Sequence, residues 1–109
     1  MRTIWAMLLC ICGAGAFADE RLAAGKAIAY DRNKGNCLSC HMMDDGELPG
    51  NSGPPLFMMQ ARFPDRAVLK AQIADASKRN PDTVMPPYGR HRILSEEELE
   101  LVVDYVHSL

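Results

Sequence analysis

Two cysteines and a histidine stand together in Cys37-Leu38-Ser39-Cys40-His41, and this motif restricts the possible fold more than any other feature of the chain. The spacing C-x-x-C-H is the attachment signature of c-type haem. About one helical turn separates the two thiols, so each can reach one vinyl group of the macrocycle and form a thioether. The adjacent imidazole then falls beneath the iron as its proximal ligand. The motif therefore predicts one covalently bound haem c, attached at Cys37 and Cys40 and ligated by His41.

Three other kinds of site use cysteines at this spacing. A structural zinc site needs four ligands, commonly in two spaced pairs, and residues 19–109 contain no second cysteine pair. A thioredoxin-like redox pair is expected within a βαβ unit, but no alternating strand pattern precedes Cys37. A single structural disulfide fits the spacing and leaves His41 without a role.

The first eighteen residues have the features of a secretory signal peptide. Arg2 supplies the positive charge, and Ala16-Phe17-Ala18 forms an A-x-A cleavage site. The apolar run between them, residues 4–11, is shorter than the ~20 residues that span a bilayer. We therefore predict a signal peptide at 1–18 and a single periplasmic domain at 19–109 with no membrane anchor after cleavage. The alternative is a buried N-terminal helix.

Length and charge limit what this domain can bind. A chain of 109 residues accommodates one domain. Its 14 acidic and 12 basic side chains give a net charge of −2, which argues against nucleic acid as a partner. The single tryptophan lies in the predicted signal peptide, so the domain has little aromatic bulk. Small exported domains of this kind usually need a disulfide, metal or cofactor, and a haem would supply the missing apolar volume.

Apolar spacing predicts helices over residues 19–30, over 64–78 and from Ser95 towards the chain end. Pro64 is tolerated in a first helical turn, and Ser95 with Glu98 forms an S-x-x-E capping box. The residues expected to share a face are Leu22, Ala23, Lys26, Ala27 and Tyr30 in the first helix, Leu69, Ile73 and Ala76 in the second, and Leu99, Val102, Val103 and Val106 in the third.

Long loops rich in glycine and proline separate these helices, over residues 44–55 and 80–92. Loops of this length pack poorly unless something fills the space between them. The predicted fold class is therefore all-α, with three or more helices and long loops wrapped around one covalently bound haem.

The second axial ligand is predicted to be Met85. Haem iron used for electron transfer normally has two axial protein ligands, and a methionine opposite histidine raises the potential. Met85 lies in the polar segment Thr83-Val84-Met85-Pro86-Pro87, where the prolines restrict the backbone and would hold a thioether in place. The other methionines are Met42 and Met43, which directly follow the proximal histidine, and Met58 and Met59, which we assign to gaps in the core.

Two histidines are rival ligands. His91 lies between Arg90 and Arg92, and we expect it to bond a haem propionate or face a partner. The two arginines can contact propionates or remain solvated. His107 falls beside the apolar face of the last helix, and we expect it to be a solvated surface residue.

Together these motifs resemble those of class I cytochromes c over essentially all of residues 19–109. The shared features are C-x-x-C-H, Gly53-Pro54-Pro55-Leu56, a methionine in a proline loop and a final amphipathic helix. The resemblance implies that the carbonyl of Pro54 accepts the ring N–H of the proximal histidine, a contact that orients metal-bound histidines.

A longer run, residues 80–94 (NPDTVMPPYGRHRIL), closely resembles the SoxX family. These proteins are the monohaem subunits of SoxAX cytochromes in bacterial sulfur oxidation. The resemblance implies a SoxA-like partner in an L-cysteine S-thiosulfotransferase-type complex, which couples thiosulfate to a carrier-protein cysteine. This chain would not bind substrate; it would accept the released electrons and pass them to a downstream cytochrome. The alternative is a free-standing class I cytochrome c that carries electrons in a respiratory chain.

Overall fold

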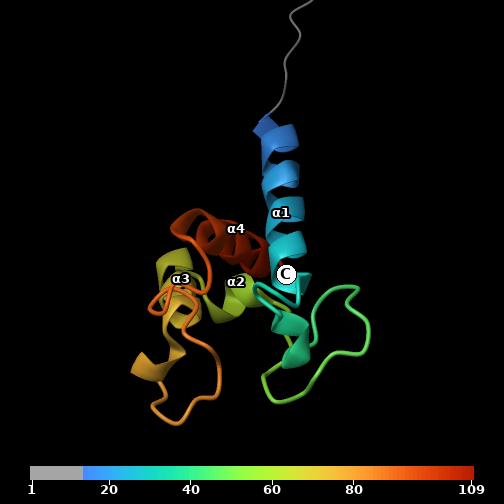
Figure 1. Ribbon diagram of the computed structural model, residues 1–109. Helices are drawn as coiled ribbons and strands as arrows, with labels where there is room; N and C mark the ends of the chain where they lie inside the picture. Colours follow the sequence, from blue (N-terminus) through green and yellow to red (C-terminus); the bar gives the residue numbers. More distant parts are fainter. Residues whose placement is uncertain (1–13) are drawn as a thin grey trace, which may run out of the picture.

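The computed structural model describes residues 14–109 (Figure 1). The helical elements are α1 (Ala14–Tyr30), η1 (Cys37–Ser39), α2 (Met59–Arg62), α3 (Arg66–Ala74), η2 (Ala76–Lys78) and α4 (Glu96–His107). Between residues 14 and 109 the only β pairing is an isolated parallel bridge between Met43 and Leu56. The all-α prediction is therefore confirmed. No helix in the described range is long and apolar enough to cross a membrane.

The helix α1 is longer than predicted, because it begins at Ala14 and continues through residue 19. Ala16-Phe17-Ala18 thus lies within a helix whose first turns are exposed to solvent. The other parts of the predicted signal peptide, Arg2 and residues 4–11, lie outside the described residues.

The face that α1 buries differs from the predicted one. The helix packs most extensively against α4, which crosses its lower part (Figure 1). Gly25 and Ala29 are buried in this contact, whereas Ala23 and Ala27, which were expected on the same face as Tyr30, are exposed. The reason is a close backbone approach: a Cβ on Gly25 would lie 2.1 Å from the carbonyl oxygen of Leu101. A glycine therefore sets the crossing point of the two helices.

The last helix forms as predicted. Ser95 is the N-cap of α4, and the amide of Glu98 donates to Ser95 Oγ at 3.1 Å. The Ser95 amide in turn donates to Glu98 Oε1 at 3.1 Å, which completes the capping box. The buried residues of α4 are Leu99, Val102, Val103, Tyr105 and Val106. Four of these five are the residues that the apolar spacing selected.

The predicted helix over residues 64–78 is divided in two. Asp65 caps α3 by accepting a hydrogen bond from the Ala67 amide at 2.9 Å, so Pro64 precedes the helix and is not part of its first turn. The other end of α3 stops at Asp75, whose carboxylate accepts from the amide and hydroxyl of Ser77. Local side-chain hydrogen bonds of this kind compete with helix continuation, and the chain resumes as the short helix η2.

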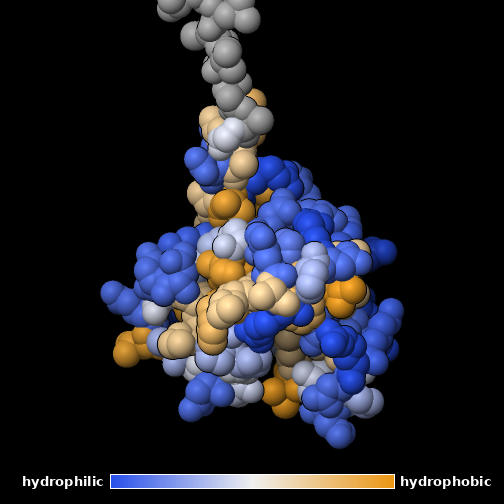
Figure 2. Space-filling view, turned by 180° about the vertical axis from the view of Figure 1, so that it is seen from behind, coloured by the Kyte–Doolittle hydropathy of each residue, from blue (hydrophilic) through white to orange (hydrophobic). Residues whose placement is uncertain are grey.

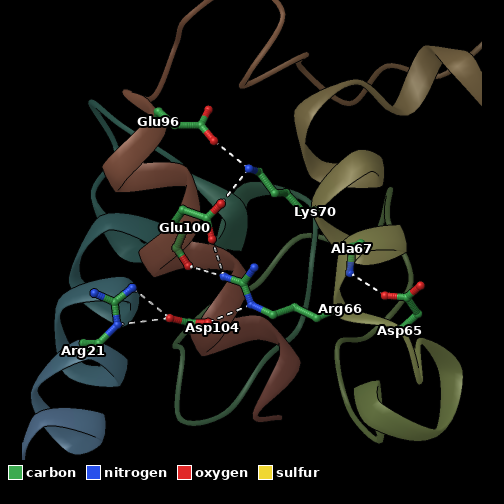
Figure 3. Close-up of polar contacts among 8 residues, drawn as sticks. All are labelled: Arg21, Asp65, Arg66, Ala67, Lys70, Glu96, Glu100 and Asp104. Atoms are coloured by element: carbon green, nitrogen blue, oxygen red, sulfur yellow. Dashed lines mark hydrogen bonds and ion pairs between the residues drawn. The ribbon is translucent and has the colours of Figure 1, made fainter.

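Ion pairs join α3 and α1 to the outer face of α4 (Figure 3). Arg66 donates to Glu100 Oε2 at 2.6 Å and to Asp104 Oδ1 at 2.8 Å, and Arg21 reaches Asp104 from the other side at 3.0 Å. Lys70 lies 2.6 Å from Glu100 Oε1, and its hydrogen bond, followed by that of Arg66, holds the pKa of the Glu100 carboxyl below its ordinary value. A single exposed ion pair contributes little to the free energy of unfolding. We therefore assign these connected pairs the role of aligning α3 with α4, and not a large stabilising effect.

Candidate haem site

A cavity of about 610 Å³ lies within the helical fold, a size in the ~300–1,000 Å³ range of cofactor pockets. In Figure 1 the segment with η1 lies on one side below α4, and α3 with the loop that follows η2 lies on the other. Both sides contribute to the cavity wall. Its apolar lining includes Leu56, Met59, Phe63, Leu69, Ile73, Leu94, Val102 and Val106. The space that the long loops were expected to leave is therefore present.

Cys37 and Cys40 both line this cavity as half-buried free thiols. The carbonyl of Cys37 accepts from the amides of Cys40 at 3.2 Å and of His41 at 2.9 Å, so the motif forms one tight turn. The two sulfurs are not joined as a disulfide. Burial raises the pKa of Cys37 to about 11, whereas reactive redox cysteines have lowered values. The site thus resembles a place for thioether attachment more than a thiol–disulfide centre.

Residues 53 and 54 contact the ring of His41 and fix its orientation. Its Nδ1 atom lies 2.7 Å from the carbonyl oxygen of Pro54. Because a carbonyl only accepts, Nδ1 donates, and Nε2 remains as the nitrogen with a free lone pair. This is the contact that the family resemblance implied for Pro54.

Gly53 completes the support of the ring. A Cβ on Gly53 would lie 2.3 Å from Cε1, 2.6 Å from Nδ1 and 2.8 Å from Nε2 of His41. The Gly53 amide also donates to the carbonyl of Cys40 at 2.8 Å, which fastens this segment to the motif. Spacing alone did not reveal this role, because nothing in the sequence indicates that a residue twelve positions away touches the ring.

The segment after His41 is anchored to α1 and α4. The hydroxyl of Tyr30 donates to Asp45 Oδ1 at 3.1 Å, and that of Tyr105 donates to Asp44 Oδ2 at 3.0 Å. Lys26 lies 2.8 Å from Asp45 Oδ1. Burial, followed by the hydrogen bonds to Tyr30 and Asp44, raises the pKa of Tyr105, so its hydroxyl stays a donor. The network positions the chain on the His41 side of the cavity.

Met85 also lines the cavity and is half-buried. Its amide donates to Thr83 Oγ1 at 3.1 Å, and the Thr83 amide donates to the carbonyl of Asn80 at 3.1 Å, so local hydrogen bonds shape the loop that presents it. Met59 is a second cavity methionine, and only 2% of it is exposed. The structure thus brings Met85 to the same space as the two cysteines and His41.

The other methionines between residues 14 and 109 do not line the cavity. Met43 is a core residue, and Met42 is exposed. Met58 was predicted to fill a gap in the core, and this is wrong: 64% of it is exposed. Met58 is the N-cap of α2 and has a left-handed φ of 52°. Its side chain is therefore exposed, whereas that of Met59, the first residue of the helix, is buried.

The basic residues around the cavity are not the ones singled out from the sequence. His91, Arg90 and Arg92 do not line it, and Arg90 instead lies 3.6 Å from Asp75. His107 is half-buried, with Nε2 2.9 Å from the carbonyl oxygen of Phe63, so the prediction of a solvated residue is wrong.

The cations that do line the cavity are Arg32, Lys34 and Arg62. No aspartate or glutamate of the described range lines it, although the whole chain carries a net charge of −2. Arg32 and Lys34 stand just before the C-x-x-C-H motif, so their place in the sequence could have indicated that they lie beside the cavity. Arg62 is held by its hydrogen bond to the Pro55 carbonyl at 2.7 Å, which only the fold reveals.

The residues present fit a haem. Two thiols one turn apart suit the two vinyl groups, and the free Nε2 of His41 and the thioether of Met85 suit an iron. Apolar walls suit the macrocycle. The three cations of the lining suit its two carboxylates, with Lys34 also paired to Glu98 Oε2 at 2.5 Å. By contrast, residues 14–109 contain no group of three or more His, Cys, Asp or Glu that could hold a metal ion by itself, which leaves the zinc alternative without support.

Comparison with known families gives one match. Residues 20–106 match the family model described as cytochrome C oxidase, cbb3-type, subunit III. No curated protein matches the chain.

Proposed function

Because the chain belongs to the cytochrome c family that this model describes, and is thus a haem-binding electron-transfer protein, we propose that it is the monohaem subunit of a periplasmic SoxAX-type complex. In this role it accepts the electrons released when a SoxA-like partner couples thiosulfate to a carrier-protein cysteine. It passes them to a downstream cytochrome and does not itself bind the substrate. The proposal includes removal of residues 1–18 as a signal peptide.

Haem supplies a one-electron couple at its iron when it is bound, and the chain's own residues set the conditions for that couple. Cys37 and Cys40 would hold the group covalently, and the Pro54 carbonyl, which accepts from Nδ1 of His41, would leave Nε2 available to the iron. Met85, from the opposite loop, would supply its thioether sulfur to the iron. The apolar wall would exclude water and disfavour the extra positive charge of the oxidised iron, so it would raise the reduction potential. A methionine ligand raises the reduction potential as well.

The observation that carries the SoxX-type assignment is the run over residues 80–94. It supplies Met85 to the cavity, and it also supplies Val84 and Ile93, which line the cavity while 81% and 41% of them are exposed. These two residues form an apolar rim at the cavity mouth. In the space-filling view apolar patches of this kind interrupt a mostly hydrophilic surface (Figure 2). A partner that docks on the rim would bring its redox centre close to the cavity.

The test is reconstitution with a SoxA-like partner and a carrier protein. We expect the chain to co-elute with the partner and its haem to become reduced when thiosulfate and carrier are added. Val84→Asp places a charge on the rim and should slow this reduction, whereas Val68→Asp, at a partly exposed valine of α3 away from the cavity, should not. A chain that stays monomeric and is never reduced in this mixture would contradict the proposal.

A second function is favoured by the family match itself. The model is described as subunit III of a cbb3-type cytochrome C oxidase, a description that names an oxidase and not sulfur oxidation. The second candidate is therefore the free-standing class I cytochrome c that carries electrons in a respiratory chain. Rapid reduction by a respiratory donor, with no effect of thiosulfate and partner, would select this alternative.

A further inference from the structure

Tyr88 joins the two sides of the cavity by a side-chain hydrogen bond. Its hydroxyl donates to the carbonyl of Gly35, two residues before the C-x-x-C-H motif. Both residues line the cavity, and both are buried. Tyr88 stands three residues after Met85, in the loop over residues 80–92, which we call the methionine loop. The bond therefore connects the segment that would attach the haem with the loop that would supply its second ligand.

The Gly35 end of this bond is fixed to α1. The Gly35 amide donates to the carbonyl of Ile28 at 3.1 Å. A Cβ on Gly35 would lie 3.0 Å from the same carbonyl oxygen and 3.2 Å from Cys37 Sγ, so the backbone here is in close contact with both the helix and the first thiol. The accepting carbonyl therefore has a defined position beside the point of haem attachment.

The backbone around Tyr88 is attached to the opposite side of the cavity. The next two amides, those of Gly89 and Arg90, donate to the carbonyl of Ala74 at the end of α3, at 3.0 Å and 3.1 Å. These bonds hold the methionine loop to α3. They leave its distance from the attachment segment to other contacts.

The bond from Tyr88 to Gly35 is the one that spans this distance. Within residues 14–109 no other hydrogen bond joins residues 80–94 to residues 31–56, two stretches that lie on opposite sides below α4 (Figure 1). Lys34 reaches Glu98 at 2.5 Å, but this pair joins the attachment side to α4 and not to the loop. Exposed ion pairs also contribute little. The Tyr88 hydroxyl is therefore the polar contact that can hold the loop closed.

We propose that Tyr88 is a positioning residue for Met85, and that its bond to Gly35 keeps the methionine loop closed across the cavity so that outside ligands do not reach the iron. Burial raises the pKa of Tyr88 to about 12, so at neutral pH the hydroxyl keeps the proton that it donates. Opening of the loop would break the bond, because Gly35 stays on α1 while Tyr88 moves with Met85. The inference rests on the proposed role of Met85 as an iron ligand.

The strength of this bond sets how often the loop opens. One ordinary intramolecular hydrogen bond changes an equilibrium constant about fivefold. A small ligand that replaces Met85 binds only to the open form, so its apparent dissociation constant falls in proportion as the open fraction rises. Loss of the Tyr88 hydroxyl should therefore tighten the binding of such a ligand by the same factor.

The experiment adds imidazole to the oxidised, haem-loaded full chain and follows the loss of the Met–iron absorption band. Tyr88→Phe removes the hydroxyl and keeps the ring. We expect it to retain the band before imidazole is added and to bind imidazole about fivefold more tightly than the parent.

The matched control is Tyr105→Phe. Tyr105 is also buried, and its hydroxyl donates to Asp44 on the His41 side of the cavity at 3.0 Å. Both variants should unfold at lower urea concentrations than the parent, because each loses a hydrogen bond of a buried tyrosine. Only Tyr88→Phe should change the affinity for imidazole, which a merely stabilising role of the hydroxyl would not do.

An unchanged imidazole affinity in Tyr88→Phe would overturn the inference. An equal rise in Tyr105→Phe would overturn it as well, since the effect would then follow from general destabilisation. If the Met–iron band is absent from the unsubstituted protein, or survives in Met85→Ala, the ligand assignment itself fails. The failure of the inference and the failure of the ligand assignment are therefore distinguishable.

Discussion

Gly53→Ala tests whether the geometry around His41 matters for the bound haem. The added Cβ would lie 2.3 Å from Cε1 of the ring, whereas ordinary contacts begin at 3.4 Å. The ring must therefore move by about 1 Å, since the atoms have to separate from 2.3 to 3.4 Å. Among residues 14–109 no glycine has a positive φ, so alanine suits the Gly53 backbone and the whole effect comes from the side-chain contact.

The size of the effect follows from what this movement disturbs. The Nδ1 to Pro54 oxygen distance of 2.7 Å would stretch towards the limit of a hydrogen bond, and such a bond contributes about 1 kcal/mol. Overpacking adds about 1–3 kcal/mol. Loss of a contact that orients a metal-bound histidine commonly weakens binding about 10- to 100-fold. We expect the free energy of unfolding of the haem-loaded protein to fall by about 2–3 kcal/mol.

The assay is a urea titration of the haem-loaded protein, followed by helical circular dichroism and by haem absorbance. Ser52→Ala is the matched control, because it alters the adjacent, exposed cavity residue without adding an atom near the ring. Neutral surface substitutions change the free energy of unfolding by at most ~0.5 kcal/mol. If Gly53→Ala stays within this range of the parent and keeps its haem spectrum, the contact of Gly53 with His41 does not support the bound haem, and the reasoning is refuted.

Three further predictions concern the iron ligand, the helix crossing and alkaline pH. Met85→Ala should retain covalent haem but lose the Met–iron absorption band and lower the potential; an unchanged band would point to another ligand. Gly25→Ala should cost about 2 kcal/mol in urea unfolding, because backbone contacts cannot yield easily, whereas Ala24→Gly, at an exposed site of the same helix, should cost only about 1 kcal/mol. A Gly25→Ala protein as stable as its parent would refute the close crossing. Burial raises the pKa of Tyr88 from 10 to about 12, so between these pH values the unfolded chain loses a proton that the folded chain keeps, and stability should fall as pH rises. Unfolding measured across this window should show a shallower fall in Tyr88→Phe, and equal slopes would contradict the prediction.

The parts of the structure that the sequence predicted are those in which the signal is local. The capping box of Ser95 and Glu98 and the apolar face of α4 depend on residues within one or two turns. The motif around Cys37 places its two thiols and His41 by its own turn geometry. The carbonyl of Pro54 was found only through a family resemblance, because its contact to the ring spans thirteen residues.

The parts that sequence reasoning missed depend on backbone contacts and on segments far apart in the chain. Gly25 has no apolar side chain to mark it as buried, yet its missing Cβ lets α1 approach Leu101. Asp75 looked like an ordinary helical position, but its side chain ends α3 by bonding Ser77. Met58 and Met59 are identical in type, and only a left-handed backbone separates the exposed from the buried one.

The proposed function requires a haem attached through both cysteines of the motif, and an intact mass measured under denaturing conditions tests this attachment most directly. The protein is produced in a host that attaches haem c in its periplasm, then digested to locate the modification. We expect one haem per chain, bound to the peptide that contains Cys37 and Cys40, and impaired attachment in Cys40→Ser. An unmodified mass, with any colour removed by acid extraction, would contradict it.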